Sequence, residues 1–180
     1  MKLINRVKSR QRSNAITKLT HELFSNFEID MSDDQLFNSD AYVNFDDKHI
    51  SMHLANELSE LDFVRQCVSV FHEYRHIQQR SDEYLCVNEL ACIGACNSYY
   101  MNDISYHSNP REIDAEHFGI VKTYDFLCRT ENKKLISDTP ENLIVNYVND
   151  RLNSEYKYFI QADVVQSVDD IDDLFENIKV

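Results

Sequence analysis

Glycine and proline are scarce in this chain, which has only two of each among its 180 residues. Both residues form turns and interrupt helices, so their scarcity favours long helices joined by few tight turns. The hydrophobic content of 43% is ordinary and is enough to build a packed core. We therefore expect an α+β fold that is mainly α, with a small antiparallel β-hairpin or sheet.

Long apolar runs and a cysteine framework are also missing. No apolar stretch approaches the length that spans a bilayer, and the N-terminus has no apolar signal-peptide core. The five cysteines are an odd number without a secretion signal, which argues for reduced thiols rather than disulfides. Cys92 and Cys96 share a helix face, but no second pair of ligands completes a structural zinc site with them. These absences predict a cytoplasmic protein without membrane contact.

Acidic residues are missing from the N-terminal segment, although the whole chain carries a net charge of −13. That net charge argues against nucleic acid as a direct partner. Two interpretations of the basic segment remain open: a solvated basic face, or an arm that contacts a partner. Its cations, which all precede the first acidic residue Glu22, are Lys2, Arg6, Lys8, Arg10, Arg12 and Lys18.

The chain shows no internal repeat and no linker, which predicts a single domain over residues 1–180. Its core is expected over about 42–129, with an N-terminal helix within 1–30 and a C-terminal helical part over 139–180. Ser59 and Asp62 form a capping-box pattern that opens a helix through the middle of the chain. Further helices are predicted over about 83–101, from Asn109 and Pro110 to Leu127, after Thr139, and over 169–178.

A β-hairpin is predicted just before that middle helix. The segments "AYVNF" and "HISMHLA" flank the polar triplet "DDK", and Ile50, Met52 and Leu54 alternate with polar residues. This alternation is typical of a half-buried strand. We expect the strand His49 to Leu54 to have an exposed edge, along which a peptide adds as an extra strand.

The stretch "VSVFHEYRHIQQR" lies on the predicted middle helix and contains the motif H-E-x-x-H at His72, Glu73 and His76. Side chains four apart on a helix lie one turn apart, so both imidazoles can reach one Zn²⁺ ion. Glu73 lies beside that face and can take a proton from a metal-bound water. The alternative is an ordinary amphipathic helix that happens to carry two histidines.

A catalytic zinc ion usually has three protein ligands, so the two histidines need a third. The candidates lie downstream, and given His72 and His76 we favour Glu112. Glu116 follows it one turn later on the same helix face and could accept a hydrogen bond from a ligand histidine. Glu112 could instead be the capping-box glutamate of a helix that begins at Asn109. The remaining candidates are His107, Asp114, Glu116 and His117.

The sequences "FHEYRHIQQ" and "EIDAEHFG" together resemble the zincin metallopeptidases with a glutamate third ligand. More specifically, the chain resembles the ImmA/IrrE-type group of small bacterial and phage proteases over about residues 42–129. The resemblance implies that His72, His76 and Glu112 hold zinc and that Glu73 is the general base. The group cleaves transcriptional repressors of mobile elements, which is a property of the family.

Amide hydrolysis also requires a group that stabilises the oxyanion, and a tyrosine, histidine or arginine often contributes to this. Tyr106 and His107, just ahead of Glu112, are the first choices, followed by Tyr99 and Tyr100. The leading hypothesis is a zinc-dependent endopeptidase that acts on a protein or peptide substrate. The alternative is a catalytically silent zincin-fold module that binds a partner protein.

Overall fold

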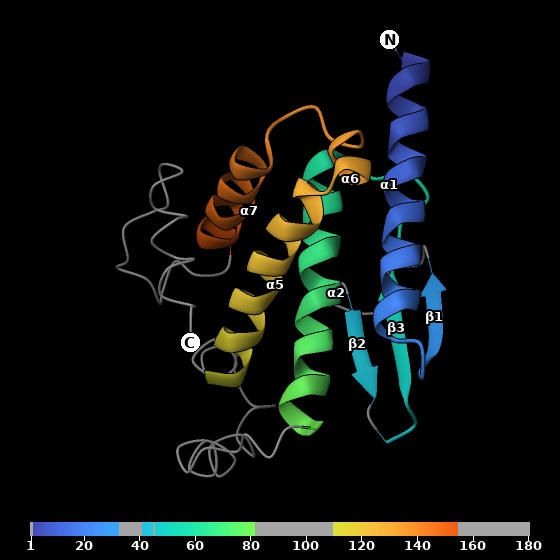
Figure 1. Ribbon diagram of the computed structural model, residues 1–180, viewed down its shortest axis with the longest axis vertical. Helices are drawn as coiled ribbons and strands as arrows, with labels where there is room; N and C mark the ends of the chain where they lie inside the picture. Colours follow the sequence, from blue (N-terminus) through green and yellow to red (C-terminus); the bar gives the residue numbers. More distant parts are fainter. Residues whose placement is uncertain (1, 33–40, 45, 82–109, 155–180) are drawn as a thin grey trace.

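The computed structural model describes residues 2–32, 41–44, 46–81 and 110–154, and within these ranges it contains five helices and a three-stranded sheet (Figure 1). The fold is α+β and mainly helical, as expected, but its small sheet is mixed rather than antiparallel. The predicted helices at 83–101 and 169–178 lie outside the described residues. In chain order the elements are α1 (Lys2–Leu23), β1 (Glu28–Ser32), β2 (Ala41–Asn44), β3 (His49–His53), α2 (Glu60–Ser81), α5 (Pro110–Cys128), α6 (Thr130–Lys133) and α7 (Pro140–Ser154).

The central element is α2, which packs against α1, α5, α7 and β2. Figure 1 shows α5 and α7 on one side of α2, with α1 and the sheet on the other. The core side chains of α2 include Phe63, Val64, Cys67 and Phe71, all of them buried. The candidate residues His72 and His76 therefore lie on a helix that is held on two sides.

The predicted caps form at two of these helices. At the start of α2 the Asp62 backbone N–H donates to Ser59 Oγ at 3.1 Å, and Ser59 Oγ donates in turn to the Asp62 carboxylate. At the start of α7 the Asn142 N–H donates to Thr139 Oγ1 at 3.2 Å. Each hydroxyl satisfies a backbone donor that the first helical turn leaves without a partner. The short helix α6 was not predicted.

The sheet has the strand order β1-β3-β2. The predicted hairpin is confirmed, because β2 and β3 pair antiparallel with Val43 opposite Ile50. The strand β1 was not predicted, and it pairs parallel with β3, with Ile29 opposite Ile50. The expectation that a substrate peptide adds along His49 to Leu54 is therefore wrong, since β3 is the central strand and has a neighbour on each side.

The basic residues of α1 mostly contact acidic groups of the same chain. Arg6 Nε lies 2.6 Å from Glu57 Oε1, and Arg10 lies 3.6 Å from the same oxygen. Arg12 is buried, and its guanidinium donates to Leu58 O, Leu135 O and Glu60 Oε1 at 3.0, 2.8 and 2.8 Å. Intramolecular pairing thus accounts for most of this charge, which does not favour a partner-binding arm.

Two small residues allow α5 to lie close against α2. Ala115 is fully buried, and a Cβ atom added to Gly119 would lie 2.8 Å from the carbonyl oxygen of Val68 and 3.0 Å from its Cγ1. Glu112 precedes Ala115 by three residues and Gly119 by seven, which puts all three on one face of α5. The close approach of the two backbones thus brings the Glu112 carboxylate to α2.

Among the described residues, no helix is both long enough and apolar enough to cross a membrane.

Candidate metal centre

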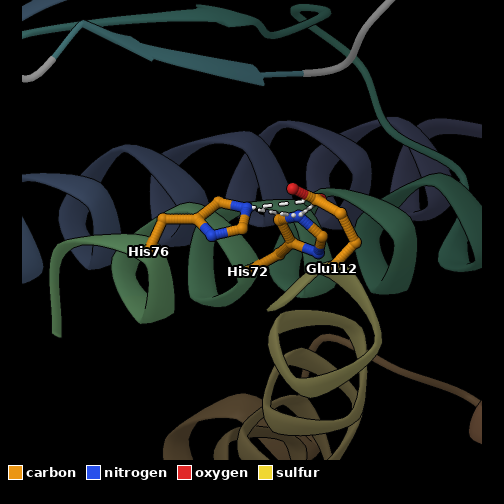
Figure 2. A group of neighbouring side chains, drawn as sticks. All are labelled: His72, His76 and Glu112. Carbon is orange, nitrogen blue, oxygen red and sulfur yellow. Dashed lines mark hydrogen bonds and ion pairs between the residues drawn. The ribbon is translucent and has the colours of Figure 1, made fainter. Parts of the chain in front are cut away.

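Three side chains from two helices converge on one point. His72 and His76 project from successive turns of α2, and their Nε2 atoms lie 3.0 Å apart. Glu112 in the first turns of α5 places Oε2 3.1 Å from His72 Nε2 and 3.3 Å from His76 Nε2. Figure 2 shows the two imidazole rings and the carboxylate directed toward one another.

The spacing of these three atoms suits a metal ion. Zinc bonds to histidine nitrogen and carboxylate oxygen at roughly 2.0–2.2 Å, so two ligand atoms in a tetrahedral site lie about 3.4 Å apart. The three observed separations are near that value. Within the part of the chain that the structure describes, His72, His76 and Glu112 are the group of histidine, cysteine and acidic side chains that could hold a metal ion.

Burial makes this group costly unless its charges are balanced. His72 and Glu112 are 9% and 8% exposed. Burial lowers the pKa of His72, but hydrogen bonds to Glu112 and Glu116 outweigh it and raise that pKa to about 10. Burial raises the pKa of Glu112, but the two histidines outweigh it and hold that pKa well below its usual range. Without metal, the pair is thus an imidazolium and a carboxylate, and a metal cation would replace the proton.

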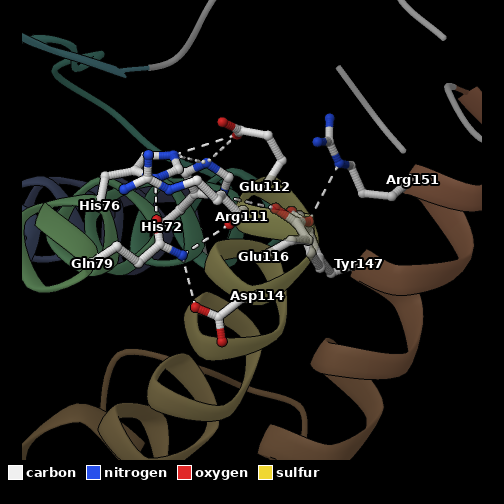
Figure 3. Close-up of polar contacts among 9 residues, drawn as sticks. All are labelled: His72, His76, Gln79, Arg111, Glu112, Asp114, Glu116, Tyr147 and Arg151. Atoms are coloured by element: carbon white, nitrogen blue, oxygen red, sulfur yellow. Dashed lines mark hydrogen bonds and ion pairs between the residues drawn. The ribbon is translucent and has the colours of Figure 1, made fainter. Parts of the chain in front are cut away.

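Behind His72 lies a second carboxylate, that of Glu116. Its Oε2 is 3.4 Å from His72 Nδ1, the ring nitrogen that faces away from the convergence point. Tyr147 on α7 donates its hydroxyl to Glu116 Oε1 at 2.7 Å, and Arg151 Nε lies 3.6 Å from the same oxygen (Figure 3). Glu116 therefore lies behind His72, where its carboxylate can fix the orientation of that ring.

Behind His76 lies an amide, that of Gln79. His76 Nδ1 is 2.9 Å from Gln79 Oε1, and the Gln79 amide nitrogen contacts Arg111 O at 3.0 Å and Asp114 Oδ2 at 2.7 Å (Figure 3). Asp114 Oδ2 also accepts a hydrogen bond from Arg75 Nε at 2.7 Å. Burial raises the pKa of Asp114, but its hydrogen bonds from Arg75 and Gln79 outweigh burial and lower that pKa. Asp114 thus supports the site from behind and is not among the converging side chains.

Glu73 differs from the other glutamates at this site. It is half-buried, and burial raises its pKa although the charges of His72 and His76 act to lower it. No hydrogen bond joins its carboxylate to another described residue, whereas Glu116 is bound by Tyr147. The carboxylate of Glu73 thus lies within the electrostatic reach of both histidines without a fixed partner among the residues described.

The other predicted site residues do not join the group. His117 is exposed on α5 and lies outside the converging group. The predicted residues Tyr106 and His107, like Tyr99 and Tyr100, lie outside the described residues.

Sequence reasoning missed three supporting residues. Gln79 follows His76 by three positions on the same helix, so the i, i+3 rule could have identified it. Tyr147 and Arg151 lie on α7, far along the chain, and no local pattern links them to His72.

The chain matches no protein-family model, no curated protein and no solved structure. The case for a function therefore rests on the geometry of these side chains.

Proposed function

We propose that this protein is a zinc-dependent peptidase. One observation carries the proposal: the Nε2 atoms of His72 and His76 and the carboxylate of Glu112 converge within 3.0–3.3 Å of one another, while Glu73 follows the first histidine directly. A buried structural ion pair would need only one histidine and one carboxylate. The second histidine and the adjacent glutamate are the additions that metal-assisted hydrolysis requires.

Zinc is the metal that this donor set favours. Two imidazole nitrogens and one carboxylate oxygen form a common ligand set of catalytic zinc, whereas magnesium and calcium prefer oxygen donors alone. Three protein donors also leave a fourth position for a reacting molecule, which a closed structural site with four protein ligands does not.

The chemistry assigns different tasks to the metal and to Glu73. A bound zinc ion would polarise a peptide carbonyl and make a water molecule more acidic. Glu73 would accept a proton from the attacking water and then donate it to the leaving amine, which requires a carboxyl group that both gains and loses a proton near neutral pH. The raised pKa of Glu73, caused by its burial, supports that exchange.

The substrate peptide would pair with β2 rather than with β3. Among the described residues β2 has a neighbour on one side only, and it is the strand that packs against α2. An extended peptide added to this strand would satisfy backbone hydrogen-bonding groups at the sheet edge. It would also run beside the helix that carries His72 and His76.

The first test is the metal content of the purified protein. We expect about one zinc ion per chain in the wild type and its loss in His76→Ala and in Glu112→Ala. The control is His117→Ala, which removes an exposed histidine of α5 and should keep the metal. Retention of zinc in Glu112→Ala would exclude Glu112 as a ligand, and a wild type that binds no supplied zinc would refute the proposal.

The second test separates an enzyme from a zinc-containing binding module. A random-peptide library is incubated with the zinc-loaded wild type and with Glu73→Gln, and new peptide ends are identified by mass spectrometry. We expect cleavage by the wild type alone, with equal zinc content in both proteins. Equal cleavage by both would remove Glu73 from the mechanism.

A further inference from the structure

The amide of Gln79 has only one orientation that satisfies its hydrogen bonds. Gln79 is 7% exposed, and one end of its amide lies 3.0 Å from Arg111 O and 2.7 Å from Asp114 Oδ2. Both of these atoms are acceptors, so the group that faces them must be the NH₂ donor. With the amide reversed, a carbonyl oxygen would lie against two other oxygens.

The orientation of this amide determines which nitrogen of His76 carries the proton. Because NH₂ faces Arg111 and Asp114, the amide oxygen faces His76 Nδ1 at 2.9 Å (Figure 3). An amide oxygen only accepts, so Nδ1 must be the donor. In a neutral imidazole with hydrogen on Nδ1, the lone pair is on Nε2. That atom faces His72 and Glu112.

The partner of Gln79 is itself held in place. Asp114 accepts from Arg75 Nε at 2.7 Å and from a second guanidinium nitrogen at 3.3 Å, while the guanidinium lies 5.2 Å from the centre of the Phe118 ring. The order of contacts is therefore Arg75 to Asp114, Asp114 to Gln79, and Gln79 to His76. Each contact fixes the orientation of the next group in this order.

We infer that Gln79 is a positioning residue of the metal site, which holds His76 in the tautomer and the ring orientation that present Nε2 to a cation. The inference rests on the proposed metal site and extends it to a residue outside the H-E-x-x-H motif. It also explains why an amide suits this position: a carboxylate could accept from His76 but could not donate to Asp114 and Arg111.

The chain supplies a matched control one residue away. Gln78 Oε1 accepts a hydrogen bond from Arg75 Nη1 at 3.2 Å, whereas Gln79 is the amide that contacts His76. Zinc affinity is measured by competition with a chelator for the wild type, Gln79→Met and Gln78→Met. We expect Gln79→Met to bind zinc roughly ten- to a hundredfold more weakly, as is typical when a partner of a ligand histidine is removed. Gln78→Met should bind like the wild type, and equal affinities for the two variants would overturn the inference.

An exchange of groups provides a rescue that a mere packing role does not predict. Gln79→Glu alone brings a carboxylate against Asp114, and we expect weaker zinc binding. In the double variant with Asp114→Asn, the new amide can donate to Glu at position 79 and accept from Arg75, with the net charge of the wild type. Zinc affinity should return toward the wild-type value, and a double variant no better than Gln79→Glu would contradict the inference.

The proton can also be observed in the unaltered protein. Nitrogen-15 NMR of the histidine side chains in the zinc-loaded wild type should show His76 with a protonated Nδ1 and a metal-bound Nε2. A zinc-loaded protein in which His76 binds through Nδ1 would refute the role of Gln79 while the metal site stands. A wild type that takes up no zinc would refute both.

Discussion

Two buried polar networks meet α2, one near each end, and they differ in whether they are complete. Near the start of α2, the guanidinium of Arg12 donates to Leu58 O, Leu135 O and the Glu60 carboxylate. Near its other end, His72 and His76 direct Nε2 atoms at each other and at one oxygen of Glu112.

This difference indicates that the Arg12 network stabilises the fold, whereas the His72 network can bind a ligand. Around Arg12 each acceptor meets a donor, so the network is complete without a ligand. Around His72, the single proton on Nε2 faces both the Glu112 carboxylate and His76 Nε2, so it can satisfy only part of that arrangement. A complete network stabilises the fold, whereas the incomplete one has room for a cation.

The largest expected effect is a loss of stability when the Arg12 network is broken. Arg12→Met removes the cation from three acceptors and should lower the free energy of unfolding by about 3 kcal/mol, because these groups stay buried without a donor. Arg10→Met is the control on the same helix, since Arg10 is exposed and should cost less than about 1 kcal/mol. Urea unfolding measures both. A similar loss in the two variants would show that the buried network contributes no more than the exposed ion pair.

A smaller loss of stability is expected from a substitution at the contact between α5 and α2. Gly119→Ala should gain about 1 kcal/mol in helix propensity, but the close contact with Val68 should outweigh it and destabilise the protein by about 1–3 kcal/mol. Zinc affinity should fall as well, because α5 carries Glu112. His117→Ala, two residues away and exposed, is the control for both measurements. An unchanged zinc affinity in Gly119→Ala would show that the site tolerates a shift of α5.

The incomplete network should respond to pH. The pKa of His72 is raised to about 10, so zinc must displace a proton at all lower pH values, and its apparent affinity should rise about tenfold per pH unit from pH 7 toward 10. The stability of the metal-free protein should change in the opposite direction and fall as the pH rises. A raised histidine pKa adds stability below the usual value of 6.5, and this stability is lost as the pH rises through 10.

Metal-buffered titrations and unfolding curves of the metal-free protein measure these two slopes. His72→Gln should abolish the pH dependence of stability that is due to this group. A zinc affinity that levels off above pH 7 would contradict the strong pairing of His72 with Glu112.

The smallest effect is expected behind His72. Tyr147→Phe removes the hydroxyl that donates to Glu116, which should cost about 1 kcal/mol of stability and lower zinc affinity by less than tenfold. Tyr124→Phe is the matched control, because its hydroxyl donates to Glu141 at the same distance of 2.7 Å. The control should lose similar stability and keep its zinc affinity. Equal zinc affinities in the two variants would place Tyr147 outside the metal site.

Much of this architecture could be predicted where the interacting residues are close in the chain. The caps at Ser59 and Thr139 lie within one helical turn of the groups they bind. The hairpin is formed by neighbouring segments. The strand β1 was missed because its parallel pairing with β3 joins segments about twenty residues apart, and local alternation alone does not reveal such a partner.

The sequence by itself determined that His72, Glu73 and His76 share one stretch of helix, because helical geometry brings residues four apart onto one face. It favoured Glu112 as the third ligand but left His107, Asp114, Glu116 and His117 open, because the chain alone does not show how α5 packs against α2. The tertiary structure made that choice. The close packing of α5 at Gly119 brings Glu112 to the two imidazoles. In the same packing Glu116 contacts His72 Nδ1, and Asp114 accepts a hydrogen bond from Gln79.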